Sequence, residues 1–250
     1  MITVPGGVLS GRSDIVGTRV ADFQLGQFEV TLGELKSVRE WALRHGYRSE
    51  DLYVHERVDG STSALLADGT PAQWLTWDSA VKWCNALSEK EGLTPVYMKA
   101  GSVFRGGDSA EGETSLVTMK AGANGYRLPT DAEWEWAATG GVKSRGYDFS
   151  GGNQIDEVGW MYNGVQSAPW GGLWPVGHKK SNELGFFDMT GNSGEWCSDV
   201  YSPGGRVCHR LRGTDRANWV GGDSAGVYTR DYGELNNASG FRVARSIIKP

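Results

Sequence analysis

The sequence of 250 residues has few cysteines, and their positions exclude two common kinds of scaffold. Cys84, Cys197 and Cys208 are an odd number and form no C-x-x-C pair, so neither a disulfide framework nor a zinc site is indicated. The sequence also lacks an apolar run of the roughly 18 to 20 residues that a membrane-spanning helix needs. Its first residues, MITVPGG, do not resemble a secretory signal.

Positive charge is also scarce and scattered. Lys and Arg number 25 against 30 Asp and Glu, which gives a net charge of −5, and no basic stripe is present. We therefore expect no nucleic-acid partner. Glycine and tryptophan are abundant instead, with 37 and 11 residues. This composition favours a loop-rich body anchored by large aromatic side chains over a helix bundle or an α/β barrel.

Three helix starts can be located by their capping residues. Thr31 and Glu34 form a capping-box pattern ahead of an apolar stripe, Thr76 precedes a second helical pattern, and Thr130 with Glu133 forms another capping box. After Gly141 we expect only short strands and loops, so the prediction is an α+β fold with its helices in the first half. Short strands are predicted at residues 23–30, 95–98 and 115–120.

The segment at residues 185–199, GFFDMTGNSGEWCSD, is the most informative stretch of the chain. It combines turn formers with apolar side chains that must be buried, so we interpret it as an ordered loop at the centre of the fold. Asn192 and Glu195 offer oxygen ligands to a calcium ion. One side-chain carboxylate is too few for a calcium site, so a structural turn is the favoured interpretation, and no metal or other cofactor is predicted.

Six motifs together resemble formylglycine-generating-enzyme-like proteins. They are VPGG, FEVT, LTWDSAVKWCNALS, YRLPTDAEWEWAA, NELGFFDMTGNSGEWCSD and GFRVAR, at residues 4–7, 28–31, 75–88, 126–138, 182–199 and 240–245. The resemblance spans nearly the whole chain. It implies one domain over residues 1–250 with a C-type-lectin-like α+β fold of the formylglycine-generating subtype, built from few short helices and many short strands and loops.

The same resemblance argues against the family's chemistry in this chain. The enzymes carry a pair of cysteines in the interval that corresponds to residues 212–240, and this interval contains no cysteine here. Without a thiolate there is no copper ligand and no redox nucleophile, so we predict a protein that is not an enzyme. The alternative is a formylglycine-generating-type oxidase or protein-maturation factor that uses other residues, such as Cys208 and His209. A third interpretation is a passive structural domain of a surface assembly.

The interval also resembles the variable region of proteins diversified by retroelements, such as those of Treponema, in which adenines of a template are randomised. Between His209 and Ser239, only Trp219 and Glu234 lie outside the residue types that randomised Asn codons yield. We therefore predict a variable ligand-binding region at residues 209–239, with scaffold positions at Arg210, Arg212, Gly213 and Arg242. The predicted contact residues are His209, Leu211, Thr214, Asp215, Arg216, Asn218, Trp219, Asp223, Tyr228, Thr229, Asp231, Tyr232 and Asn237.

The composition of this region is consistent with binding. Tyrosine offers rigid amphipathic contact area, and Asp, Asn, Ser, Thr and Arg supply adaptable hydrogen bonds. We therefore expect a non-enzymatic, receptor- or adhesin-like monomer that binds a protein or surface ligand. We expect it at the cell surface or outside the cell, with its export signal or lipid anchor trimmed from this sequence.

Overall fold

The computed structural model describes residues 1–10, 15–48, 52, 67–107, 116–160, 173–201, 208–213, 230–232 and 239–248, and for Tyr201, Cys208, Arg230–Tyr232 and Ser239 only the backbone. The helices are α1 (Leu32–Leu43), α2 (Trp77–Lys90), α3 (Asp131–Ala138), the 3-10 turn η3 (Gly141–Lys143) and α4 (Ile155–Val158). The strands are β1 (Ile2–Val4), β2 (Gly7–Val8), β3 (Arg19–Val20), β4 (Phe23–Leu25), β5 (Tyr97–Lys99), β6 (Ser102–Val103), β7 (Val117–Met119), β8 (Gly194–Tyr201), β9 (Cys208–Arg212), β10 (Arg230–Tyr232), β11 (Ser239–Gly240) and β12 (Ala244–Ser246). Few helices and many short strands agree with the predicted α+β layout.

The three long helices begin where their capping residues predict. At α1, Thr31 Oγ1 accepts a hydrogen bond from the Glu34 amide at 3.3 Å, and Glu34 Oε2 accepts one from the Thr31 amide at 2.8 Å. At α3, Thr130 and Glu133 make the same reciprocal pair, at 3.1 and 2.8 Å. Each pair satisfies two amides that the first turn leaves without partners. The capping prediction at Thr76, before α2, is also confirmed.

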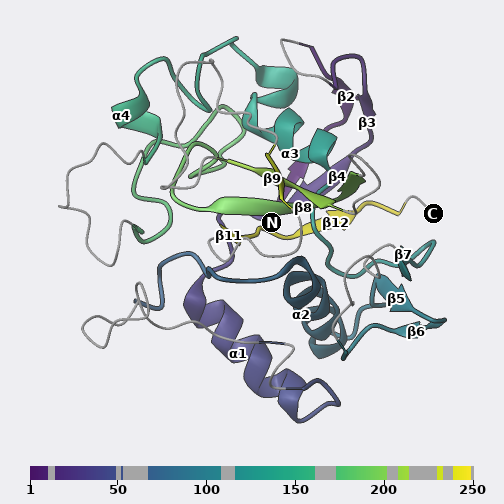
Figure 1. The fold of residues 1–250 in the computed structure, drawn as a ribbon. Coiled ribbons are helices and arrows are strands. Elements are labelled where there is room, and N and C mark those ends of the chain that lie inside the picture. Colours follow the sequence, from purple (N-terminus) through teal and green to yellow (C-terminus); the bar gives the residue numbers. More distant parts are fainter. Residues whose placement is uncertain are drawn as a thin grey trace.

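The central sheet has the strand order β10-β9-β8-β11, and it lies between two layers of helix (Figure 1). Helices α1 and α2 lie on one side of this sheet and α3 lies on the other (Figure 1). Successive side chains of β8 point to the two sides: Trp196 belongs to the core that α1 and α2 cover, and Cys197 to the core that contains Trp134 of α3. Residues of β8 are therefore shared between two cores.

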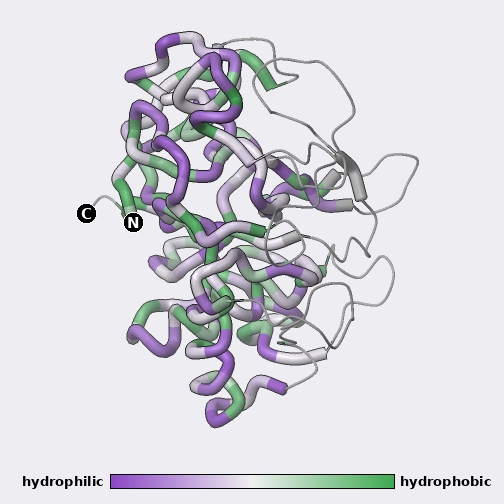
Figure 2. Tube along the Cα trace, turned by 90° about the vertical axis from the view of Figure 1, so that its left-hand side faces the viewer, coloured by the Kyte–Doolittle hydropathy of each residue, from purple (hydrophilic) through white to green (hydrophobic). Residues whose placement is uncertain are grey.

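The described residues also form smaller sheets. β4 pairs with both β1 and β12, so the two ends of the chain lie on the same side of the molecule (Figure 2). β5 pairs with β6 and β7 in a second antiparallel sheet beside α2 (Figure 1). The predicted strands near residues 95–98 and 115–120 are confirmed within one or two residues by β5 and β7.

Three sequence predictions are corrected. The segment at residues 185–199 is not a loop throughout, because Gly194–Tyr201 forms β8 between β9 and β11. The strand expected at residues 23–30 ends at Leu25, since the carbonyls of Gly26 and Gln27 accept hydrogen bonds from Arg242 at 3.1 and 3.3 Å. Helical turns do occur after residue 140, in η3 and α4, where a single turn is too short to show a periodic pattern.

Candidate functional site

The strands at the two ends of the predicted binding region, β9 and β11, both pair with β8 of the central sheet. Glu195 of β8 lies opposite Arg212 of β9 on one side and opposite Gly240 of β11 on the other. The strands that flank residues 213–238 therefore pair with opposite edges of β8.

A buried ion pair fixes the returning end. The guanidinium of Arg242 donates to both carboxylate oxygens of Glu195 at 2.6 Å, and both residues are fully buried. The indole of Trp134 donates to the same carboxylate at 2.6 Å. Although burial opposes its charge, the adjacent Glu195 carboxylate holds the pKa of Arg242 above its usual value. Bidentate geometry and three charge-assisted hydrogen bonds make this contact stiff and specific.

A second buried arginine fixes the departing end. Arg212 is fully buried and donates to the carboxylate of Asp131 on α3, and its Nη2 lies 3.4 Å from Glu135 of the same helix. Its neighbour Arg210 lies 3.8 Å from Asp131. Arg212 and Arg242 are therefore scaffold, as their sequence positions predict. We call Asp131, Trp134, Glu195, Arg212 and Arg242 the ionic frame.

The first two predicted contact residues lie inside the protein. His209 is 5% exposed and stacks on Trp77 at a ring separation of 3.8 Å, and Leu211 is 5% exposed in the core that α1 and α2 cover. Neither ring nitrogen of His209 has a hydrogen-bond partner among the described residues. Burial lowers the pKa of His209 to about 4, and the nearby backbone of Asp199, which raises this pKa, only partly offsets the effect of burial. Both side chains lie in the core rather than on the predicted contact surface.

The remaining predicted contacts are placed only in part. Asp231 and Tyr232 are in β10, whose backbone pairs with β9 so that Tyr232 lies opposite His209 and Asp231 opposite Arg210. The structure thus brings this part of the region back onto the central sheet. The other predicted contacts lie outside the described residues: Thr214, Asp215, Arg216, Asn218, Trp219, Asp223, Tyr228, Thr229 and Asn237.

The residues considered for calcium are occupied by hydrogen bonds within the protein. The Asn192 amide donates to Glu29 at 2.9 Å, and its oxygen accepts from the Trp174 backbone at 3.0 Å. Glu195 is part of the ionic frame. Burial, together with the nearby Asp188 and Glu195 carboxylates, raises the pKa of Glu29 well above its usual value. Within the described ranges, no three His, Cys, Asp or Glu side chains are grouped as a metal site would require.

The two cysteines whose side chains are described lack the features of a reactive thiol. Cys84 and Cys197 are free and fully buried, and burial raises the pKa of each thiol. A thiol needs a lowered pKa and some exposure to act as a nucleophile or a metal ligand, and these two have neither. Cys208 begins β9, and only its backbone is described.

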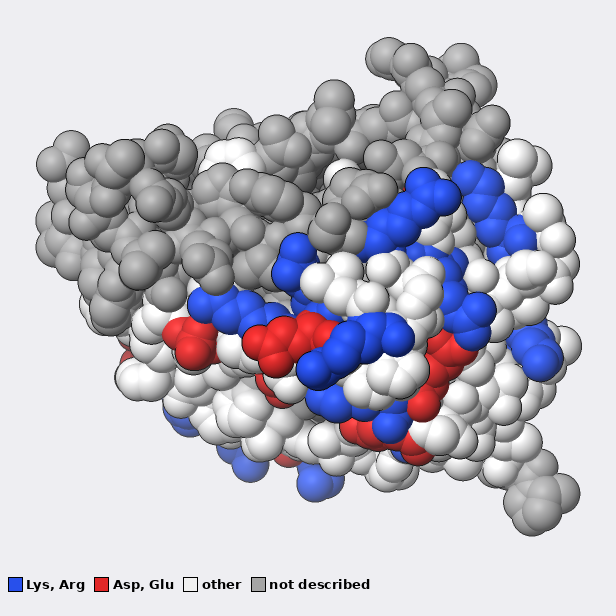
Figure 3. All heavy atoms as spheres, turned by 90° about the horizontal axis from the view of Figure 1, so that it is seen from below, with Lys and Arg blue, Asp and Glu red and all other residues white. Residues whose placement is uncertain are grey.

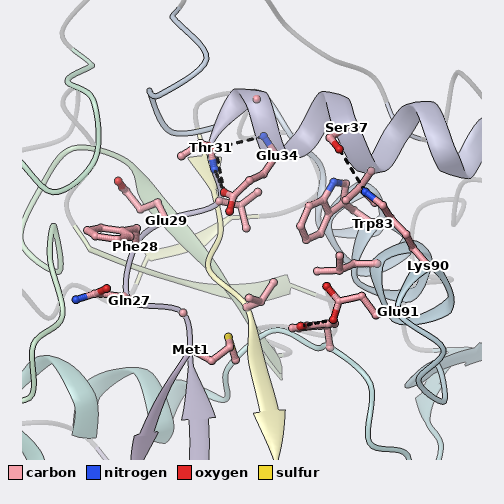
Figure 4. A pocket seen from close by; sticks show the side chains of 17 residues that line it. Met1, Gln27, Phe28, Glu29, Thr31, Glu34, Ser37, Trp83, Lys90 and Glu91 are labelled. Carbon is pink, nitrogen blue, oxygen red and sulfur yellow. Dashed lines mark hydrogen bonds between the residues drawn. The ribbon is translucent and has the colours of Figure 1, made fainter.

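The sequence analysis does not predict a groove that lies between α1 and α2 (Figure 4). It has a volume of about 510 Å³ and is lined by residues of α1, α2, the segment after β4 and the chain near β12. Glu34, Lys90 and Glu91 stand around it, and Trp83 lies between them (Figure 4). Its walls come from segments far apart in the chain, and no local sequence pattern shows that these segments meet.

The surface below α1 and α2 carries both signs of charge. Lys and Arg side chains lie next to Asp and Glu side chains across the described part of this face, without a field of one sign (Figure 3). Among the residues that the structure describes, no helix is both long and apolar enough to cross a membrane.

Comparisons with known sequences identify two relatives that differ in how much of the chain they match. Chaperone protein LppX of Paenibacillus barcinonensis is 32% identical over 246 residues, covering 91% of this chain and 81% of that protein. Inactive C-alpha-formylglycine-generating enzyme 2 of Mus musculus is 33% identical over 147 residues, covering 50% of this chain and 45% of that protein. The chain therefore spans less than half of the mouse protein.

Two solved structures share the fold over almost the entire chain. CarF superposes with a TM-score of 0.81 and 26% identity, covering 99% of this chain and 98% of that one. Treponema denticola variable protein 1 superposes with a TM-score of 0.71 and 24% identity, covering 98% and 94%. These likenesses confirm the predicted C-type-lectin-like fold of the formylglycine-generating subtype.

A family model described as sulfatase-modifying factor enzyme 1-like domain matches residues 1–247. This match covers all six sequence motifs, the ionic frame and the groove. It agrees with the relationship that the motifs predict. The chain belongs to the family of sulfatase-modifying factor enzyme 1-like domains.

Proposed function

We propose that this protein is a non-enzymatic binding protein that presents residues 209–239 to a protein or surface ligand. The observation that carries the proposal is the ionic frame, whose Glu195 lies opposite Arg212 of β9 and Gly240 of β11, the two strands at the ends of this region. A binding loop gains affinity when its ends are fixed in advance, because less freedom is lost on binding. The Tyr, Asp and Asn content of the region supplies the contacts that such loops use.

The cysteines support the non-enzymatic part of the proposal. Residues 212–240 contain no cysteine, and Cys84 and Cys197 are buried thiols with raised pKa. The family also contains a mouse relative whose name describes it as inactive. We therefore place the protein among binding members of the family, at the cell surface or outside the cell, with its variability supplied by a retroelement.

The proposal is tested in the DNA beside the reading frame. We expect a near-copy of the segment that encodes residues 209–245, differing mainly where the copy has adenines, and a reverse-transcriptase gene nearby. The control is the segment that encodes residues 125–160, for which no such copy is expected. Absence of both the copy and the reverse transcriptase would contradict diversified binding.

A protein-maturation role is the second candidate, and the relative named chaperone protein LppX favours it. Neither ligand binding nor protein maturation requires copper and a reactive thiol, whereas an oxidase of the formylglycine-generating type requires both. We expect the purified protein neither to bind copper stoichiometrically nor to oxidise a cysteine in a sulfatase-type peptide. Turnover of that peptide would show that the protein is an enzyme and would contradict the non-enzymatic proposal.

A further inference from the structure

The groove between α1 and α2 has an apolar floor beneath a charged rim. Val38, Trp83, Leu87 and Val243 line its apolar part, and Phe28, which is 36% exposed, stands at its edge. Its volume of about 510 Å³ lies in the range of cavities that hold small molecules or single side chains of a partner. The occupant it suits is therefore amphipathic, with an apolar stem and a polar end.

The charged groups of the rim have unused hydrogen-bonding capacity. Glu34 Oε2 accepts from the Thr31 amide and hydroxyl at 2.8 and 3.0 Å, and Glu91 Oε2 accepts from the Tyr126 hydroxyl at 2.7 Å. Neither Oε1 atom has a partner within the described part of the chain. The ammonium of Lys90 donates to Ser37 at 3.2 Å, a contact toward α1 (Figure 4). The rim thus offers two open carboxylate acceptors and one ammonium held by a neighbouring hydroxyl.

We propose that this groove binds the side chain of an arginine on a protein partner. The methylene stem of arginine packs on the apolar floor, and its guanidinium donates to the open oxygens of Glu34 and Glu91. Arginine fits better than lysine because its planar group carries five donors and is less strongly hydrated. No residue of the groove belongs to residues 209–239, so this is a second, separate contact surface.

The probe is N-acetyl-leucyl-arginine amide, titrated into the full chain and followed by NMR. Its matched control is the citrulline analogue, which has the same shape without the charge. The arginine peptide is expected to shift resonances of groove residues and to bind about tenfold more tightly than the citrulline peptide, as loss of a charge-assisted hydrogen bond predicts.

Three substitutions test whether the groove favours a positively charged side chain. Glu34→Gln and Glu91→Gln keep the capping box and the Tyr126 acceptor while removing charge, so each is expected to weaken binding about twofold to fivefold. Lys90→Gln removes a repelling cation and is expected to strengthen binding by a similar factor. Glu157→Gln on α4 lies outside the groove and is the control, with no change expected.

The proposal is overturned by no binding of the arginine peptide at millimolar concentration, by equal binding of the citrulline peptide, or by weaker binding of the arginine peptide by the Lys90→Gln variant. The last result would indicate a groove for an acidic side chain. Equal affinities in all four variants would indicate purely apolar contact and would equally contradict it.

Discussion

The ionic frame and the groove use the same kinds of side chain in opposite ways. In the frame, Arg242 and Glu195 are fully buried and bind each other through two hydrogen bonds of 2.6 Å. At the groove, Glu34 and Glu91 are exposed, and each keeps one carboxylate oxygen without a partner in the described structure. Charged groups that pair with each other in the interior stabilise the fold, whereas charged groups that stay unpaired at the surface are available to a ligand.

The two regions should therefore respond very differently to the loss of a cation. Breaking a buried pair strands a charge that water cannot reach, whereas an exposed charge remains hydrated when its neighbour is removed. Stability measurements separate the regions, and the following expectations run from the largest effect to the smallest.

Arg242→Met is expected to lower the free energy of unfolding by about 3–5 kcal/mol, because it leaves the buried Glu195 carboxylate unpaired near Glu29 and Asp188. Urea unfolding measures this change. Lys90→Met at the groove is the matched control and should cost less than about 0.5 kcal/mol. Similar losses in both variants would show that the frame is no more important for stability than the groove rim.

Lowering the pH from about 6.5 to about 4 should destabilise the protein through His209. Its folded pKa of about 4 lies below the unfolded value of 6.5, so the unfolded chain binds the proton first in this window. The full shift corresponds to roughly 3 kcal/mol. Burial raises the pKa of Glu29 and Asp188, so the contribution of these two groups to stability increases as the pH falls, opposite to that of His209.

The His209→Phe variant isolates this contribution, because phenylalanine keeps the stack on Trp77. The free energy of unfolding of the variant minus that of the natural protein should rise as the pH falls from 6.5 to 4. A difference that stays constant over this window would mean that His209 does not titrate with a lowered pKa.

Thr130→Ala and Thr31→Ala should each cost about 1 kcal/mol, the usual value of an N-cap. The first substitution weakens the start of α3, which carries Asp131 and Trp134 of the frame, and the second weakens α1 beside the groove. Thermal unfolding of both variants compares the frame with the groove, because the same kind of N-cap is removed in each. A negligible effect at Thr130 would show that the frame holds α3 without its cap.

Glu34→Gln and Glu91→Gln are expected to change the free energy of unfolding by less than about 0.5 kcal/mol each. Glutamine preserves the hydrogen bonds that both carboxylates make, and the lost charges are exposed. Urea unfolding of the double variant checks this. A larger loss of unfolding free energy would show that the two carboxylates stabilise the fold. The groove rim would then not differ from the ionic frame in this respect.

The local parts of this fold could be predicted from sequence, and the non-local parts could not. The partners of each capping pair, Thr31 with Glu34 and Thr130 with Glu133, are only three positions apart, so their geometry is contained in the sequence around them. The sequence predicts a loop where β8 forms, because the pairing of β8 depends on β9 and β11. Glycine-rich composition around a strand indicates turns but does not show which partner lies beside it.

The candidate sites show the same limit. Codon and residue types marked residues 209–239 as a unit, but they could not show that the side chains of His209 and Leu211 point into the core. That orientation depends on the face of β9 that meets Trp77 and α2. The groove escaped prediction because Glu34, Glu91 and Val243 meet only after folding.

The most direct test of the central claim is to sequence this coding region in many independent clones of the source population. The account predicts amino-acid changes confined to residues 209–239 and concentrated at the predicted contacts other than the buried His209 and Leu211, with Glu195, Arg212 and Arg242 unchanged. Changes spread evenly along the chain, or changes at the arginines of the frame, would contradict a variable binding region held by a constant frame.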